Sequence, residues 1–288
     1  MRKGFARLAV LATVTAAAYP LAAVANRQTP GSAAGVRLYV LDGGTLTVKE
    51  PTGFGLTRAE VKETDMVSPA FLIVHPTGSL LWDTGLGDHL IGRPTWETMV
   101  GAFGQTVSSP LKGQLAAIGY APGRITYLAL SHMHFDHVGN GNDYATATWL
   151  VQRPERAAMF GDQAPSSNPA AVRYSALRDA RTMILDGDHD VFGDGTVVIK
   201  STPGHTPGHQ SLFVRLTKTG AVVLSGDLYH YPEERTLNRM PAREATEGRT
   251  AASRASLDAF IKTTSADLWI QHDLGHWRQL KKSPAYYD

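Results

Sequence analysis

The chain has 288 residues, of which 28 are basic, 26 are acidic and none is cysteine. The absence of cysteine excludes disulfides, thiolate metal sites and a cysteine nucleophile. Three basic residues and no acidic residue fall within the first 25 positions, so the remainder carries 25 basic against 26 acidic residues. This balance argues against a nucleic-acid partner, because nucleic acids are bound by a clustered basic surface.

The N-terminus has the pattern of a secretory signal peptide at residues 1–25. Basic residues (Arg2, Lys3 and Arg7) precede an apolar stretch at residues 8–18, and the segment ends in Ala23-Val24-Ala25. The apolar stretch is too short for a typical membrane span, although an uncleaved N-terminal anchor is the alternative. We therefore expect cleavage before Asn26 and export to the periplasm or the medium. No membrane association is expected after cleavage, and residues 26–288 should form one domain.

The first half of this domain contains short apolar runs that predict strands. Residues 36–41 and 45–48, separated by Asp42-Gly43-Gly44, predict one hairpin, and residues 70–74 and 79–82 predict another. Residues 111–118 have helical periodicity and end at a glycine. Residues 125–130 form a continuous apolar run, which is typical of a buried strand.

A second series of runs follows. Strands are predicted at residues 148–151, 197–200, 211–216, 221–225 and 268–271, and a helix at residues 250–261. This mixture indicates an α/β fold, with two sheets covered by helices in a single domain.

The densest group of chemically capable residues directly follows the strand predicted at 125–130. Four side chains within six positions could bind a metal: His132, His134, Asp136 and His137. Imidazole nitrogens and carboxylate oxygens suit zinc and similar divalent ions. The alternative is a solvated polar loop, which the density of the cluster disfavours.

Three further candidate ligands follow later strands. His205 comes after residues 197–200, Asp227 after residues 221–225 and His272 after residues 268–271. Functional side chains are commonly placed where strands of α/β proteins end, because the loops there escape the packing demands of the core. Seven ligands exceed the need of one tetrahedral zinc and suit two metals that share a carboxylate.

The ordered set His-x-His-x-Asp-His, followed by His205, Asp227 and His272, resembles the metallo-β-lactamase superfamily. Asp83-Thr84-Gly85 and the Pro-Gly-His loop within residues 202–209 support the likeness. The resemblance implies a four-layer αββα sandwich. It also implies that His132, His134 and His205 hold one metal, that Asp136, His137 and His272 hold the other, and that Asp227 bridges them. We expect two divalent ions, with Zn²⁺ as the metal.

Within the superfamily the chain is most similar to N-acyl-homoserine lactonases, which quench quorum sensing. The sequence TPGHTPGHQS at residues 202–211 and the 22 residues from His205 to Asp227 carry this likeness. The best-known lactonases place a tyrosine three residues after the bridging aspartate, where this chain has His230. Tyr229 and Tyr231 flank it, so the residue that contacts the substrate is open among these three.

The resemblance implies that a metal-bridging hydroxide attacks the lactone carbonyl, and that Asp136 relays a proton to the leaving oxygen. The expected partner is a small molecule, either an acyl-homoserine lactone or another lactone or ester, and a homodimer is left open. Two alternatives remain. One is another hydrolase of the superfamily, acting on a phosphotriester, thioester or β-lactam. The other is a non-hydrolytic metal-binding protein or redox di-iron protein.

Several other residues have less direct predictions. His209 is expected to brace its loop, and Asp83 to order the ligand loops by hydrogen bonding. The run at residues 233–235 is expected to be solvated surface. An acyl chain needs an apolar pocket, and three irregular stretches could supply it: residues 85–103, 155–177 and 229–241.

Overall fold

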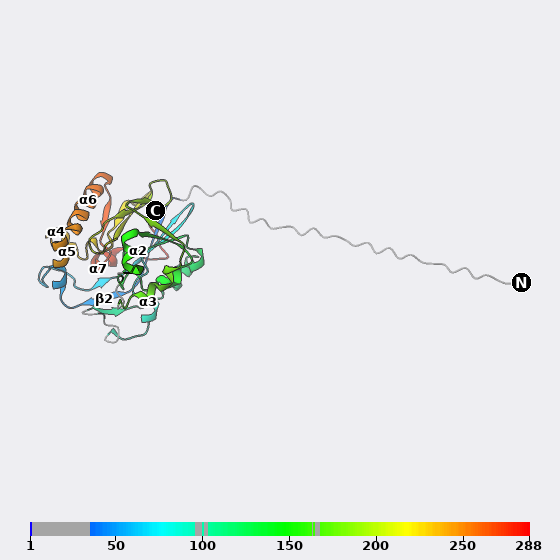
Figure 1. The fold of residues 1–288 in the computed structure, drawn as a ribbon, viewed down its shortest axis with the longest axis horizontal. Helices are drawn as coiled ribbons and strands as arrows, with labels where there is room; N and C mark the ends of the chain where they lie inside the picture. The colour runs from blue at the N-terminus through cyan, green and yellow to red at the C-terminus, as the bar shows by residue number, and fades with distance from the viewer. Residues whose placement is uncertain (2–34, 96–99, 101–102, 163, 165–167) are drawn as a thin grey trace. The chain divides into compact units, whose positions relative to one another are not determined.

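The computed structural model describes Met1, residues 35–95, Val100, residues 103–162, Ala164 and residues 168–288 (Figure 1). Apart from Met1, the predicted signal peptide lies outside the described residues. Residues 34–288 form one compact unit. None of the helices described is both long enough and apolar enough to cross a membrane.

The larger of the two main sheets has six strands in the order β1-β4-β5-β7-β8-β9. The four strands from β5 to β9 form three parallel pairs. The pairs β1–β4 and β4–β5 are antiparallel. The predicted hairpin at residues 70–74 and 79–82 is confirmed, with Pro76 and Thr77 as its turn. The strands are β1 (Arg37–Leu41), β4 (Ala70–His75), β5 (Gly78–Trp82), β7 (Tyr127–Ala129), β8 (Thr148–Gln152) and β9 (Thr182–Leu185).

The second main sheet has five strands in sequence order. Its strands pair antiparallel except for the last two, which are parallel. They are β10 (His189–Asp190), β11 (Val197–Ser201), β12 (Gln210–Leu216), β13 (Gly220–Leu224) and β14 (Asp267–Trp269).

A small third sheet shows that the first predicted hairpin is wrong. It joins β3 (Met66–Val67), β2 (Thr45–Val48) and β6 (Phe103–Thr106), so β1 and β2 lie in different sheets. The connection packs tightly, because a Cβ atom at Gly43 would lie 2.1 Å from the carbonyl oxygen of Ser68. Gly44 has a φ of +112°. The two glycines let the chain pass from one sheet to the other instead of folding back.

The helices predicted at residues 111–118 and 250–261 are confirmed as α1 and α6. Figure 1 shows α4, α5 and α6, in orange, on one side of the domain and α2 and α3, in green, on another. The α-helices are α1 (Leu111–Ala117), α2 (Arg153–Phe160), α3 (Ala171–Tyr174), α4 (Pro232–Thr236), α5 (Ala242–Glu247), α6 (Arg249–Thr264) and α7 (Leu274–Gln279). Short 3₁₀ helices include η1 (Pro51–Phe54), η2 (Asp88–Leu90), η4 (Pro122–Arg124), η5 (Gly141–Tyr144), η6 (Ser175–Arg178) and η7 (Gly226–Leu228).

Three buried clusters define four layers. The two main sheets pack face to face through side chains such as Trp82 and Leu212. The outer face of the six-stranded sheet packs on α1, α2 and α3, with Trp149 fully buried there. The outer face of the five-stranded sheet packs on α6 through Phe213 and Leu257. The predicted αββα sandwich is therefore confirmed.

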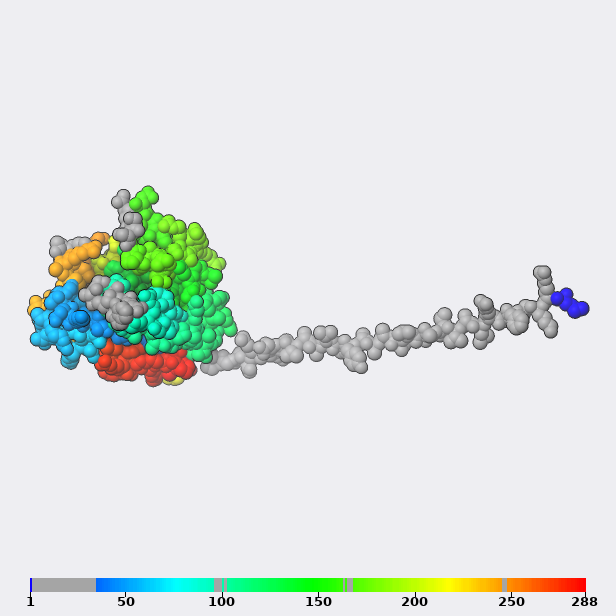
Figure 2. All heavy atoms as spheres, turned by 90° about the horizontal axis from the view of Figure 1, so that it is seen from below, coloured from blue at the N-terminus to red at the C-terminus, as the bar shows by residue number. Residues whose placement is uncertain are grey.

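The C-terminal segment covers the edge of the six-stranded sheet. The backbone of Tyr287 exchanges two hydrogen bonds with Leu38 of β1, at 2.8 and 2.9 Å. Figure 2 shows the C-terminal residues, in red, along one side of the domain. Because an uncovered edge strand invites pairing with other chains, this segment protects the sheet from association.

Candidate metal centre

Four strand ends deliver the seven predicted ligands to one place. The loop after β7 carries the cluster at residues 132–137, and the loops after β11, β13 and β14 carry His205, Asp227 and His272. The parallel pairing of β13 and β14, with Leu224 opposite Trp269, makes the loops after them leave the sheet on the same side. The structure thus brings together all seven residues singled out in the sequence.

The first group of candidate ligands contains three imidazoles and one carboxylate, from His132, His134, His205 and Asp227. The Nδ1 atom of His134 lies 2.9 Å from Nε2 of both His132 and His205. Asp227 Oδ2 lies 3.5 Å from His132 Nε2 and 3.3 Å from His205 Nε2. Four ligands around one zinc ion stand about 3.3 Å apart, so this spacing suits a four-coordinate site.

The second group contains Asp136, His137 and His272. Asp136 Oδ2 lies 3.7 Å from His137 Nε2 and 3.5 Å from His272 Nε2. The other oxygen of Asp227, Oδ1, lies 3.0 Å from the same two nitrogens. One carboxylate therefore presents one oxygen to each group.

Two buried atoms of the centre lack a hydrogen-bond partner. His137 Nε2 and Asp227 Oδ1 lie 3.0 Å apart, yet they do not bond to each other or to any other described group. Leaving a buried polar atom unpaired costs about 1–3 kcal/mol, and more for a charged group. A divalent cation between the two atoms would satisfy both, so the donor set fits two metal ions.

Hydrogen bonds behind the imidazoles fix the direction of their rings. The Nδ1 atoms of three histidines donate to acceptors outside the centre, and Nε2 is left facing inward. His137 donates to Asp83 Oδ2 at 2.9 Å, and His272 donates to the carbonyl oxygen of Val67 at 2.7 Å. His205 donates to Glu244 Oε1 at 2.8 Å. Such partners set the tautomer and orientation of metal-binding histidines.

Burial and neighbouring charges shift the pKa values of the centre in both directions. Burial lowers the pKa of His132 and His134 well below the usual value, which leaves both rings neutral and able to bind a metal. Burial would raise the pKa of Asp227, but the neighbouring His137 and His272 hold it well below its usual range. Burial would lower the pKa of His137, but the neighbouring carboxylates, Asp227 first among them, raise it well above its usual value.

Asp83 joins the loops that carry the second group, as its sequence context suggested. It is fully buried, and its Oδ1 accepts a hydrogen bond from the backbone of Ser131 at 2.6 Å. Its Oδ2 accepts from Gln271 Nε2 at 2.9 Å, and Gln271 Oε1 accepts from Trp82 and from the backbone of Gly226. No sequence pattern indicates a role for Gln271, because an amide side chain after a strand is not a typical metal ligand.

His209 braces the backbone of Asp227. Its Nδ1 donates to the carbonyl oxygen of Thr202 at 3.0 Å, and its Nε2 accepts from the backbone N–H of Asp227 at 2.9 Å. Burial lowers the pKa of His209 to about 3, so the ring is neutral and can accept this bond. The bracing predicted for His209 is confirmed.

Among the three candidates for substrate contact, only His230 faces the centre. His230 Nε2 lies 3.4 Å from Asp227 Oδ2, whereas the hydroxyl of Tyr231 donates away from the centre to the carbonyl oxygen of Thr64. The Tyr229 ring packs in the core beneath α6.

A buried carboxylate holds His230 in place. Glu234 Oε1 lies 3.1 Å from His230 Nδ1, and Glu234 Oε2 lies 2.6 Å from Nη2 of Arg254. Burial opposes the charge on His230, but Glu234 and Asp227 together raise its pKa to about 10. The prediction that residues 233–235 are solvated surface is wrong for Glu234, which is fully buried because α6 supplies its cationic partner.

An apolar pocket of about 250 Å³ opens over both metal groups. Residues 229–241 contribute His230 and residues 85–103 contribute Phe103, whereas the described part of residues 155–177 contributes nothing. Trp96 and Met99 lie outside the described residues. Besides candidate ligands and His230, its walls are formed by Leu46, Phe54, Met66, Phe103 and Phe135.

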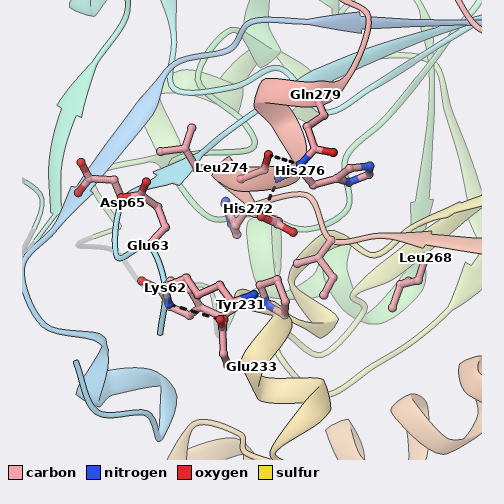
Figure 3. A pocket seen from close by; sticks show the side chains of 14 residues that line it. Lys62, Glu63, Asp65, Tyr231, Glu233, Leu268, His272, Leu274, His276 and Gln279 are labelled. Atoms are coloured by element: carbon pink, nitrogen blue, oxygen red, sulfur yellow. Dashed lines mark hydrogen bonds between the residues drawn. The ribbon is translucent and has the colours of Figure 1, made fainter. Parts of the chain in front are cut away.

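A larger groove of about 520 Å³ lies on another side of His272 (Figure 3). Its lining is rich in charged groups, including Lys62, Glu63, Asp65 and Glu233. An apolar substrate tail therefore fits the smaller pocket, which also faces the candidate metal ligands.

The sequence profile described as the Metallo-beta-lactamase superfamily matches residues 64–271. The chain belongs to the metallo-β-lactamase superfamily. The superfamily likeness predicted from the ligand motif is thereby confirmed.

Several relatives of the chain are named N-acyl homoserine lactonases. N-acyl homoserine lactonase AttM of Azorhizobium caulinodans is 29% identical over 261 residues, which cover 88% of this chain and 99% of that protein. N-acyl homoserine lactonase AiiA of Bacillus thuringiensis subsp. kurstaki is 26% identical over 222 residues, covering 75% and 85%. A solved N-acyl homoserine lactone hydrolase, with N-hexanoyl-L-homoserine at its catalytic metal centre, has the same fold. Its TM-score is 0.72 at 23% identity, over 87% of this chain and 98% of that one. The protein is a metal-dependent hydrolase of this superfamily.

Proposed function

We propose that this protein hydrolyses the lactone ring of N-acyl-homoserine lactones at a centre of two divalent metal ions, with zinc as the expected metal. The observation that carries the two-metal proposal is the placement of Asp227, whose two oxygens face different ligand groups. The lactonase relatives and the apolar pocket above the centre support the choice of substrate.

The ligand groups divide the work of holding the metals. His132, His134 and His205 would hold one ion, Asp136, His137 and His272 the other, and Asp227 both. When bound, such ions lower the pKa of water to provide a nucleophile at neutral pH, and they polarise a carbonyl group. Water then adds to the lactone carbonyl carbon, the ring C–O bond breaks, and the ring oxygen takes up a proton to give an N-acyl-homoserine.

The chain's own residues bind and orient this substrate. The apolar walls of the pocket accept the acyl chain, and each buried methylene contributes about 0.8 kcal/mol. His230 lines the same pocket, with Glu234 behind it. We assign to its Nε2 the contact with the substrate carbonyl that a tyrosine makes in the best-known lactonases. Asp136, which also lines the pocket, is assigned the proton transfer to the ring oxygen.

A substrate panel tests the proposed reaction. Metal-loaded protein is given N-hexanoyl-homoserine lactone, paraoxon, a thioester and a chromogenic cephalosporin, and acid release or colour is recorded. We expect lactone opening to exceed the other reactions by at least about 100-fold in kcat/KM, because the apolar pocket and the metals favour this substrate together. Efficient turnover of the phosphotriester or cephalosporin without lactone opening would refute the assignment.

The metal content of a bridge variant tests the two-metal centre. Asp227→Ala removes one ligand from each group, so metal analysis should give fewer than two ions per chain. Asp194→Ala, which changes an exposed turn carboxylate, is the control. Two tightly held ions in the Asp227 variant would show that the carboxylate does not bridge.

We also propose that the enzyme acts outside the cytoplasm. The signal pattern at residues 1–25 supports this. Mass spectrometry of protein recovered from a periplasmic or secreted fraction should find Asn26 as the first residue. Full-length protein confined to the cytoplasm would contradict the proposal.

A further inference from the structure

A buried carboxylate on α2 lies beneath the first metal group without touching any of its ligands. Glu155 stands in the first turn of α2, directly after β8, and it is 2% exposed. The sequence placed it at the start of an irregular stretch, with no role in the centre. Neither a role in the reaction nor exposure to solvent therefore accounts for a glutamate at this position.

Both oxygens of Glu155 accept hydrogen bonds from loops that carry metal ligands. Oε1 accepts from the backbone N–H of Met133 at 2.9 Å. Oε2 accepts from the hydroxyl of Thr206 at 2.8 Å and from the backbone N–H of Gly208 at 2.9 Å. Met133 directly precedes His134, and Thr206 directly follows His205. One carboxylate thus fixes two separate loops at the points where they present imidazoles to the same metal group.

The second loop rests directly on the start of the helix. A Cβ atom at Gly208 would lie 2.4 Å from the backbone nitrogen of Glu155 and 2.6 Å from its Cβ atom. Only glycine fits such an approach. The position of the loop carrying His205 therefore depends on α2 through both backbone packing and the Glu155 carboxylate.

Asp83 has the matching role for the second group. It accepts a hydrogen bond from His137 of that group, and another from Gln271, the residue directly before His272. Each metal group is therefore braced by its own buried carboxylate.

We propose that Glu155 is a positioning residue for the first metal ion, setting the separation of His134 and His205 and hence the affinity of that ion alone. The proposal depends on the metal centre of the proposed function and is independent of which substrate is hydrolysed. Groups that orient metal ligands typically contribute 10–100-fold to metal affinity. Glu155→Gln keeps the shape of the side chain but points an N–H₂ group at an N–H or O–H donor, so at least one of the two loops loses its bond.

The experiment measures zinc affinity by competition with a chromophoric chelator. We place Glu155→Gln in two backgrounds that each lack one ligand, His272→Ala to weaken the second metal group and His205→Ala to weaken the first. It should weaken the first ion about 10–100-fold in His272→Ala, where the first group is intact. In His205→Ala, where the second group is intact, the affinity should be unchanged. Within the His272→Ala background, zinc affinity is compared with and without Glu155→Gln, and this comparison holds whether the unmodified chain binds one ion or two. Failure of the two-metal centre would instead appear in the metal content of the unmodified chain.

Two further variants separate positioning from general stability. Thr206→Val removes a single donor to Glu155, and it should weaken the first ion in the same direction by a smaller factor. Asp190→Asn is the control, because Asp190 accepts backbone N–H bonds from Gly193 and Gly195 in a turn away from the centre. It should lower the Tm without changing zinc affinity. Equal zinc affinity in Glu155→Gln and the unmodified chain, or equal weakening in both backgrounds, would overturn the proposal.

Discussion

Replacing Arg254 with methionine should destabilise the fold by about 3 kcal/mol, at the lower end of the cost of breaking a buried ion pair. Arg254 is 6% exposed, and its guanidinium donates to Glu234 and to the carbonyl oxygens of Leu228 and Arg239. Without it, the Glu234 carboxyl group loses its arginine partner in a site with no exposure to solvent. The lower value applies because His230, with a pKa of about 10, still offers Glu234 a second cation.

The assay is urea unfolding at fixed zinc concentration, compared with Arg235→Met. Arg235 pairs with Asp258 at 2.9 Å between the same two helices, but both side chains are more than 40% exposed. This control should therefore cost less than about 1 kcal/mol. Adding Glu234→Gln to Arg254→Met should recover part of the loss, since it removes the uncompensated charge. Equal effects of the two arginine variants would refute the argument from burial.

Three other predictions concern the metals, acid stability and the pocket. Removing the metals with a chelator should lower the Tm in calorimetry by roughly 8–16 °C for each ion lost. An ion present at a thousand times its Kd stabilises the fold by about 4 kcal/mol, and each kcal/mol shifts the Tm of a chain this size by roughly 2–4 °C. An unchanged Tm would contradict metal binding to the folded protein. The pKa of Asp194 is lowered to about 2, first by the hydroxyl of Thr196. Its contribution to stability is therefore complete above about pH 4 and lost as the pH falls towards 2, so Asp194→Ala should reduce the stability difference between about pH 6 and pH 3 in urea unfolding. Phe54 packs on the His230 ring at 4.5 Å, so Phe54→Ala should lower kcat and raise KM, whereas Phe103→Ala should mainly raise KM. Equal kcat values in steady-state kinetics of the two variants would contradict this difference.

The convergence of the candidate ligands could be predicted from the sequence because coordination chemistry restricts the residue types. Few residue types bind zinc, and the candidates lie in the loops that follow four apolar runs, each of which forms a strand. The pairing of β13 with β14 then brings Asp227 and His272 together, as the topology of the sandwich requires. Prediction succeeded where one local pattern determined both the residue type and its place at a strand end.

Contacts between distant segments could not be predicted in this way. The Asp42-Gly43-Gly44 turn has the composition of a hairpin, but Gly43 packs closely against Ser68 and Gly85, which lie in other loops. Glu234 lies in a charged run that is typical of solvated surface, and its burial depends on Arg254, 20 residues later. The pocket has the same origin, since each of its apolar side chains alone is indistinguishable from a core residue.

The origin of the ligand loops explains why buried carboxylates surround this centre. The loop with residues 132–137 leaves the six-stranded sheet, whereas His205, Asp227 and His272 follow strands of the five-stranded sheet. The two sheets share no backbone ladder, so strand pairing cannot fix the distance between the two sets of ligands. Individual hydrogen bonds across the boundary do so instead: the backbone N–H of Gln210 donates to the carbonyl oxygen of Ser131, and Gln271 donates to Asp83. Metal binding and the packing of the two sheets must therefore be coupled, because an ion held by ligands from both sheets stabilises their interface.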